Sequence, residues 1–337
     1  KYEQTGLLTE LYTTNEFSQP SGDGSEANPY EIATLENLAW VMYNDTVWDK
    51  NFIQTANINA AKTIVWKDST GFTPIGNSTL SFSGRYNFKG YTIDSLHIIR
   101  ESEDYIGLFG YTNNSEIDSL GLTNLNIKGN NYVGGIIGYQ QNGSVNACYT
   151  IGNIQGEITQ AYTSGKIGGL IGESNGNVIN SYSNTEVKSG VNMTGGLIGW
   201  LSTGGIVENS YSKGSVNGNN RVGGLIGDNR GLIKNCYSYS SVSGASEIGG
   251  LIGYNSGNVK NSYSLGIISG NSNAGGLIGS QGYYGKVSNS FWDTETSEIQ
   301  NSVGGTGLTS SQMKEFVTYL KADWDFIDET YIGSDDA

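Results

Sequence analysis

The sequence predicts an all-β chain wound into a single-stranded, right-handed parallel β-helix with a short capping helix at each end. Two observations predict this fold class: a short apolar word returns many times, and no helical period is found inside the repeats. The word is GGLIG at 168–172, 195–199, 223–227, 249–253 and 275–279, GGIIG at 134–138 and GLFG at 107–110.

Each repeat contains three short segments. The glycine before the apolar pair returns at intervals of 28, 34, 27, 28, 26 and 26 residues, followed by a word such as NSYS and a third segment such as GSVNG. Three strands of about five residues with short turns fill such a repeat, whereas a propeller blade needs about 40 residues. We therefore expect roughly nine or ten stacked coils, right-handed because parallel crossovers generally are.

Two apolar columns lie next to each other in the word. The first is Leu108, Ile136, Leu170, Leu197, Leu225, Leu251 and Leu277, and the second is Phe109, Ile137, Ile171, Ile198, Ile226, Ile252 and Ile278. Successive side chains of a regular strand point to opposite faces, so one column would form an exposed apolar stripe. If the flanking glycines bend the chain, both columns lie inside. We favour the second alternative.

Three more columns follow from the NSYS word. The asparagines are Asn180, Asn209, Asn235, Asn261 and Asn289, and they suit a left-handed bend with stacked amides. The next column is small: Cys148, Ser181, Ser210, Cys236, Ser262 and Ser290. Its cysteines are three coils apart, about 14 Å by strand spacing, which predicts two free thiols.

The aromatic column consists of Tyr149, Tyr182, Tyr211, Tyr237, Tyr263 and Phe291. Stacking of aromatic rings along the axis is enough to explain it, and a sugar-binding platform is the alternative.

A stack of coils exposes strand edges at both ends, so the sequence should supply caps. In 33–44, Thr34 is the expected N-cap of a helix with an apolar face of Leu35, Leu38, Ala39 and Met42. In 307–320, Thr309 and Gln312 have capping-box spacing, and Leu308 and Met313 fit a hydrophobic staple. The expected apolar face of this second helix is Met313, Phe316, Val317 and Leu320.

The predicted parts of the chain follow from these features. They are an N-terminal extension (1–22), a cap helix with irregular first coils (23–100), the repeat β-helix (101–292) and a C-terminal cap (293–337).

The charge restricts the partners. With 18 Lys and Arg against 32 Asp and Glu, the net charge is −14, which repels nucleic acid and anionic lipid. No apolar run is long enough to enter a membrane as a helix. We expect a monomer that binds neither nucleic acid nor membrane.

The repeated word together with NSYS resembles the GLUG-motif repeat family of bacterial surface proteins. DGSEANPYEIATLENLAWV (23–41) and FTPIGNSTLSFSGRYNFKGYTIDSL (72–96) resemble the segments that precede such repeats, and NSFWDTETSE (289–298) and GGTGLTSSQMK (304–314) resemble the segments that close them. The resemblance implies an adhesin-like protein outside a bacterial cell or at its surface, where a lipid anchor is one option. Some members are labelled immunoglobulin A1 proteases, but the resemblance supplies no catalytic site.

The protease label can be tested on the residues. A zinc peptidase of that kind needs HExxH, and this chain has a single histidine, His97, in a strand-like segment. No GxSxG elbow, phosphate loop or calcium nonapeptide accompanies it. We therefore expect no enzyme, no cofactor and no metal.

The candidate ligand-binding residues come directly after each word, where the coils differ most: Tyr139, Glu173, Trp200, Asp228 and Tyr254, with Ser280 last. Glu173 and Asp228 are two coils apart, about 9.6 Å by strand spacing, with Trp200 between them. Inverting glycosidases hold their carboxylates at a similar separation. The alternative is a solvated rim that happens to hold two acids.

Three functions remain open. The first is a non-catalytic module for adhesion to, or binding of, a host or environmental glycan or protein. The second is a carbohydrate-active enzyme, a hydrolase or lyase, on the same scaffold, and the third is a structural stalk. Fold alone does not choose among them.

Overall fold

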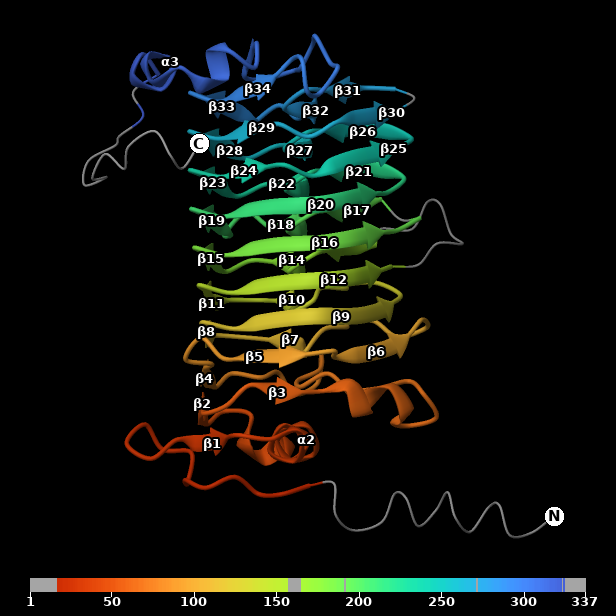
Figure 1. Ribbon diagram of the computed structural model, residues 1–337, viewed down its shortest axis with the longest axis vertical. Coiled ribbons are helices and arrows are strands. Elements are labelled where there is room, and N and C mark those ends of the chain that lie inside the picture. The colour runs from red at the N-terminus through yellow and green to blue at the C-terminus, as the bar shows by residue number, and fades with distance from the viewer. Residues whose placement is uncertain (1–16, 157–164, 191, 271, 323, 325–337) are drawn as a thin grey trace, which may run out of the picture.

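The computed structural model describes residues 17–156, 165–190, 192–270, 272–322 and 324. The predicted N-terminal extension and C-terminal cap therefore lie partly outside the described residues. Within these residues the chain forms a right-handed parallel β-helix, with the coils stacked along the long axis (Figure 1). The predicted fold class is confirmed.

Four sheets run along the stack, and neighbouring strands in them pair in parallel. Sheet A contains β1 (Tyr30–Ile32), β2 (Asn51–Gln54), β4 (Arg85–Asn87), β8 (Ser115–Asp118), β11 (Gly143–Asn146), β15 (Asn177–Ile179), β19 (Ile206–Glu208), β23 (Leu232–Lys234), β28 (Asn258–Lys260) and β33 (Lys286–Ser288). Sheet C contains β7 (Phe109–Thr112), β10 (Ile137–Gln140), β14 (Ile171–Ser174), β18 (Ile198–Leu201), β22 (Ile226–Asn229), β27 (Ile252–Asn255) and β32 (Ile278–Gln281).

The NSYS word and the segment after it form sheet B, and a fourth sheet precedes each GGLIG. Sheet B contains β3 (Ile58–Asn59), β5 (Thr92–Asp94), β6 (His97–Arg100), β9 (Gly121–Gly129), β12 (Tyr149–Gln155), β16 (Tyr182–Lys188), β20 (Tyr211–Asn217), β24 (Tyr237–Ser238), β25 (Ser241–Gly244), β29 (Tyr263–Ser264), β30 (Ile268–Gly270), β34 (Phe291–Asp293) and β35 (Thr306–Leu308). Sheet D contains β13 (Lys166–Gly168), β17 (Met193–Gly195), β21 (Asn220–Gly223), β26 (Ser246–Gly249) and β31 (Ala274–Gly275). The expected three strands per coil are thus supplemented by a short fourth strand.

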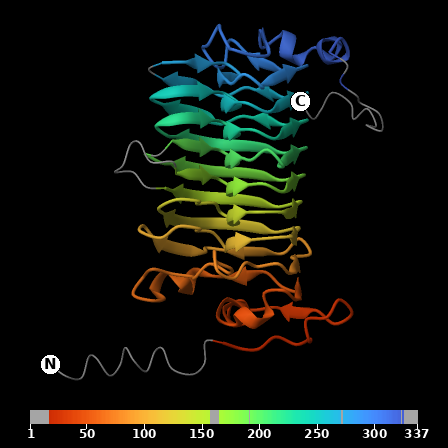
Figure 2. The same cartoon turned by 180° about the vertical axis from the view of Figure 1, so that it is seen from behind.

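About seven coils are complete, fewer than the nine or ten expected, because β1 to β5 belong to irregular first turns. Figure 2 shows the stack from behind, with the irregular part at its N-terminal end. Both apolar columns of the word are fully buried, from Leu108 and Phe109 to Leu277 and Ile278. The word spans the corner between sheets D and C, so the bend turns both side chains inward, as we favoured.

The columns of the NSYS word also form as predicted. The five asparagines have φ between 50° and 54°, and Asn209 Nδ2 donates to Asn180 Oδ1 at 3.3 Å. Every member of the small column is buried, and Cys148 and Cys236 are free thiols. Burial raises the pKa of each thiol to about 12.

The N-terminal cap agrees with its prediction. Helix α2 (Leu35–Tyr43) has Thr34 as its N-cap with a full capping box to Asn37, and Leu35, Leu38, Ala39 and Met42 are buried. The 3-10 turns η1 (Asp45–Val47) and η2 (Ala61–Val65) follow it.

The C-terminal cap agrees only in its first turn. Thr309 and Gln312 form the reciprocal capping bonds, and Met313 is buried. However, the turn ends as η3 (Gln312–Lys314), because Glu315 is extended, and α3 (Phe316–Leu320) has only five residues. Phe316, Val317 and Leu320 are 59%, 45% and 49% exposed. The expected apolar face against the coils is wrong for these three residues.

Candidate functional site

The predicted site residues form one continuous column on the outer face of sheet C. The strand register pairs Tyr111 with Tyr139, Tyr139 with Glu173, Glu173 with Trp200, Trp200 with Asp228, and Asp228 with Tyr254. All five predicted residues therefore lie side by side in chain order.

A second column faces this one across the corner between sheets D and C. Each member comes before the residue that directly follows the repeated word, by six positions in the first coil and by seven in the others. The members are Tyr105, Tyr132, Lys166, Met193, Arg221, Glu247 and Asn273. The structure brings Lys166 to Glu173 and Arg221 to Asp228, each from the same coil. The constant spacing between the two columns is present in the sequence. It could not predict that they touch, because the strands of sheet D were not predicted.

Each carboxylate of the predicted column forms an ion pair with at least one cationic side chain. Lys166 Nζ lies 3.8 Å from Glu173 Oε2, and Ser202 Oγ donates to Glu173 Oε1 at 3.1 Å. Asp228, which is fully buried, is held by Arg221 at 2.6 Å and Arg230 at 3.5 Å. This ionic half of the corner is internally neutralised.

Burial is the main influence on the pKa of both carboxyl groups. Desolvation raises the pKa of Glu173, and Lys166 opposes the rise. Desolvation likewise raises the pKa of Asp228, against the pull of the Arg221 and Arg230 guanidiniums. A raised carboxyl pKa would suit a general acid, but acid catalysis also needs access to substrate, and neither carboxyl is free.

Trp200 lies at the centre of the ionic half. Lys166 Nζ is 4.1 Å from the centroid of the Tyr132 ring and 5.1 Å from that of Trp200, and the Arg230 guanidinium is 4.8 Å from Trp200. The two cations belong to the coils on either side of Trp200, so its ring is used in cation–π contacts. The indole Nε1 has no acceptor among the described residues.

The first two coils form an aromatic half. Tyr105 stacks on Tyr132 with ring centroids 4.7 Å apart, and Tyr111 and Tyr139 lie 4.8 Å apart. All four rings are partly exposed. Burial raises the pKa of Tyr139 to about 12, helped by Glu173. Sequence reasoning identified Tyr139 of this group and missed the other three.

A hollow of about 370 Å³ adjoins the aromatic half. It lies between the first coil and the N-terminal cap. Its lining combines apolar and polar side chains: Met42, Trp48, Thr73, Pro74, Asn77, Ser78, Glu103, Asp104, Tyr105 and Ile106. Asn130 Nδ2 donates to Asp104 Oδ1 at 2.8 Å, and Arg100 pairs with Glu103 at 2.9 Å. This mixture is typical of small-molecule sites of that size.

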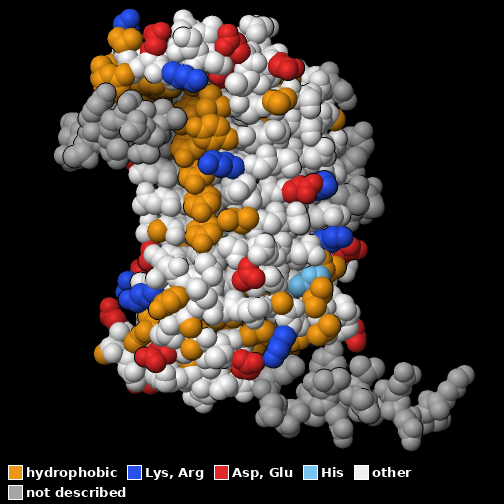
Figure 3. Space-filling view, viewed as in Figure 1, with side chains coloured by type: hydrophobic (Ala, Val, Ile, Leu, Met, Phe, Trp, Pro, Cys, Tyr) orange, Lys and Arg blue, Asp and Glu red, His pale blue; other side chains and the backbone are white. Residues whose placement is uncertain are grey.

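The tyrosine column on sheet B is a ladder rather than a platform. From Tyr149 to Tyr263, neighbouring rings are 4.7–5.1 Å apart with interplanar angles of 1–9°. The ladder forms part of the hydrophobic stripe on this face (Figure 3). Because the ring faces cover one another, they are not available to stack on a sugar; Gly121 lies below Tyr149 and Trp324 lies beside Tyr263.

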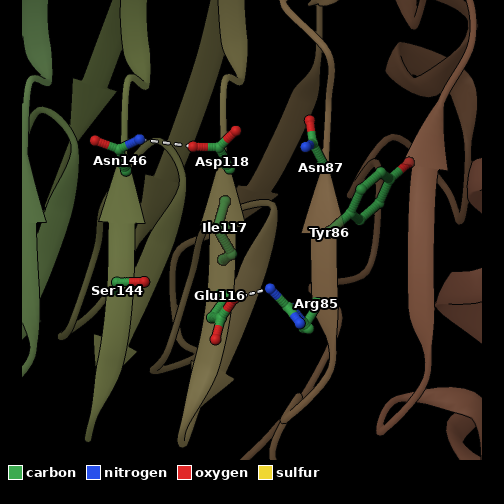
Figure 4. Close-up of a pocket in the computed structure, with 8 residues that line it drawn as sticks. All are labelled: Arg85, Tyr86, Asn87, Glu116, Ile117, Asp118, Ser144 and Asn146. Atoms are coloured by element: carbon green, nitrogen blue, oxygen red, sulfur yellow. Dashed lines mark hydrogen bonds and ion pairs between the residues drawn. The ribbon is translucent and has the colours of Figure 1, made fainter. Parts of the chain in front are cut away.

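Sheet A carries a second hollow, shown in Figure 4, at β4, β8 and β11. Four of its charged or amide side chains pair with one another: Arg85 pairs with Glu116 at 2.8 Å, and Asn146 donates to Asp118 at 2.7 Å. We therefore do not regard it as the candidate site. Among the described residues, no group of three or more His, Cys, Asp or Glu could hold a metal ion. No helix in this part of the chain is long and apolar enough to cross a membrane.

Sequence comparison identifies the repeat and two relatives. The profile of the GLUG motif matches residues 190–217. Halomucin from Haloquadratum walsbyi is 33% identical over 193 residues, which are 56% of this chain and 2% of halomucin. A Gly-rich membrane protein, so named provisionally, from Evansella cellulosilytica is 33% identical over 104 residues, 30% of this chain and 12% of that protein. The chain thus spans only a small part of the curated relatives it matches.

Two solved structures share the fold. A Bacteroides ovatus protein, provisionally named an immunoglobulin A1 protease, aligns with a TM-score of 0.60 and 18% identity over 89% of both chains. An IgA1 protease aligns with a TM-score of 0.59 and 14% identity over 90% of this chain and 25% of that one. The predicted resemblance is therefore confirmed: the chain carries a GLUG motif at 190–217, and its repeats are wound into a parallel β-helix.

Proposed function

We propose that the protein is a non-catalytic binding module for a neutral saccharide, held outside the cell or at its surface. The observation that carries this proposal is the hollow beside Tyr105, where a partly exposed aromatic ring meets Asp104, Asn77 and Ser78. Sugar rings offer apolar C–H faces for an aromatic ring and hydroxyls for polar groups. The charges of the adjoining corner are already paired, which favours a neutral ligand.

The place outside the cell is part of the same proposal. It is supported by the names of the two sequence relatives, a mucin and a membrane protein. A rigid stack of coils would present the hollow at its N-terminal end. A host or environmental glycan fits this arrangement, and a protein ligand remains the outcome if glycans fail to bind.

The test is binding of Tyr105→Ala to a glycan array, followed by titration calorimetry with the best oligosaccharide. We expect affinity to fall at least tenfold, by analogy with nucleic-acid bases, for which stacking on one aromatic side chain is worth roughly 1–3 kcal/mol. Asp104→Asn should weaken binding less. Tyr91→Ala is the matched control, since Tyr91 lies in the turn before β5 and has no part in the hollow. Equal losses in Tyr105→Ala and Tyr91→Ala would refute the site.

A carbohydrate-active enzyme is the second candidate, favoured by the raised pKa values of Glu173 and Asp228. The arrangement argues against it, because Lys166, Arg221 and Arg230 occupy both carboxylates. Product release from the bound oligosaccharide, lost in both Glu173→Gln and Asp228→Asn, would establish the enzyme. Binding without product release supports the non-catalytic binding module. If no ligand binds, the structural stalk is the remaining function.

A further inference from the structure

A third hollow, of about 650 Å³, lies on β28 and β33. Figure 1 shows these two strands at the C-terminal end of sheet A. Two exposed lysines, Lys260 and Lys286, line it together with Asn258, Gln281 and Ser288. No acidic side chain is found in its lining among the described residues. The chain as a whole carries a net charge of −14, so this hollow departs from the general surface.

The two lysines differ from their neighbours in having no counter-ion. On β23, the strand of sheet A that precedes β28, Lys234 pairs with Glu208 at 2.7 Å. No ion pair to Lys260 or Lys286 is found in the described part of the chain. The register places Lys286 opposite Asn258, and Lys260 opposite Ser288. The two lysines are therefore diagonal neighbours, about 8 Å apart at Cα from strand spacing and rise.

The turn that leads into β33 adds two exposed aromatic rings. Tyr283 and Tyr284 are 94% and 74% exposed, more than any other large hydrophobic side chain described. Their rings meet edge to face, with centroids 5.1 Å apart, so they do not cover each other as the ladder rings do. Gln281 Nε2 donates to Gly285 O at 2.9 Å, which fixes the turn beside the lysines.

We propose that this hollow binds an acidic polysaccharide, with Lys260 and Lys286 pairing with its carboxylate or sulfate groups and Tyr283 or Tyr284 stacking on a sugar ring. Charge complementarity selects the occupant, since two free ammonium groups need anions and the tyrosines need apolar ring faces. The net charge of −14 repels a densely charged nucleic-acid duplex, whereas an acidic polysaccharide also offers sugar ring faces to the two tyrosines. The site is distinct from the hollow beside Tyr105.

The test uses the whole protein with three immobilised ligands: oligogalacturonate, dextran sulfate and neutral dextran. We expect at least one acidic ligand to bind and neutral dextran not to, with affinity falling as salt rises from 20 to about 200 mM. The first two ligands tell carboxylate from sulfate recognition. The double variant K260Q/K286Q should lose binding at least tenfold, and Y283A/Y284A at least threefold.

The matched control is K62Q/K89Q, which removes the same charge at exposed positions of the N-terminal part. An equal loss in this control would show nonspecific attraction and overturn the site. So would failure of both acidic ligands at 20 mM salt, or duplex DNA that binds through the same two lysines. Tyr105→Ala should leave acidic-ligand binding unchanged, which separates this inference from the proposed function.

Discussion

The surroundings of single glycine residues explain why the word GGLIG varies so little from coil to coil. In 195–199 the three glycines have φ outside the left-handed region, so close approach rather than backbone freedom requires them. A Cβ on Gly196 would collide with Gly224 O and approach Ser212, and a Cβ on Gly199 would collide with the backbone of β13 in the preceding coil. The word is thus a steric fit at the corner between sheets D and C.

Replacing Gly199 with alanine should destabilise the protein by about 1–3 kcal/mol, the usual cost of forcing extra volume into a packed site. Gly204→Ala is the matched control, because the nearest atom to its Cβ belongs to the flexible side chain of Asn175. Its cost should stay near 0.5 kcal/mol, as for surface changes. Urea unfolding followed by circular dichroism measures both. Similar costs would contradict the steric account.

The small column predicts which substitution of Cys148 is tolerated. Leu120 N donates to Cys148 Sγ at 3.4 Å, and in the next coil Cys148 N donates to Ser181 Oγ at 3.1 Å. Cys148→Ser keeps an acceptor in the slot, whereas Cys148→Ala leaves the Leu120 N–H without one, at about 1–3 kcal/mol. Unfolding free energies should therefore rank Ser above Ala. The reverse order would show that volume alone governs this position.

At the scale of elements, the tyrosine ladder couples stability to alkaline pH. Burial raises the pKa of Tyr237 to about 12 from an ordinary value of 10. A raised folded-state pKa means that the stabilisation is complete below pH 10 and is lost as pH rises towards 12. Burial likewise raises the pKa of the Cys148 and Cys236 thiols to about 12, so their ionisation adds to the loss of stability at alkaline pH.

We expect the free energy of unfolding to be flat from pH 7 to 8, to begin to fall near pH 9, where the thiols of the unfolded chain ionise, and to fall further between pH 10 and 12. Tyr237→Phe should make the fall shallower, because it removes one titrating group and keeps the stacked ring. Urea titrations at each pH, with phenolate absorbance at 295 nm, measure both effects. Tyr91→Phe is the control, and an equally shallow fall in that variant would remove the ladder from the explanation.

The strands and helices also show which parts of the fold could be predicted from the sequence. The columns of the word and of NSYS fixed the coils and their register, because each column repeats one residue type. Sheet D escaped prediction because its strands have two to four residues and share little except the terminal glycine. The cations opposite Glu173 and Asp228 were missed for that reason. The prediction of the second helix was wrong in its extent, because a helix of five residues, none of them buried, is too short to hold a regular apolar face.

At the scale of the whole molecule, the two ends of the stack are closed unequally. The N-terminal end is covered by α2 with its buried face, and Phe52, Phe82, Tyr86 and Phe109 form an aromatic cluster behind it. At the C-terminal end, α3 has no buried residue. Since each coil of a solenoid is stabilised mainly by its neighbours, local opening should begin at the less covered end.

Hydrogen exchange read by mass spectrometry tests this asymmetry. Amides of β31 to β33 should exchange at least tenfold faster than those of β2 and β4, because about 1.4 kcal/mol less protection gives that ratio. Strand β18 in the middle of the stack serves as the internal reference and should exchange slowest. Leu38→Ala, which removes a fully buried side chain of α2, should speed exchange at β2 and β4 and leave β33 unchanged. Faster exchange at the N-terminal end of the unmodified protein would show that the C-terminal turns seal the stack better than their buried surface indicates.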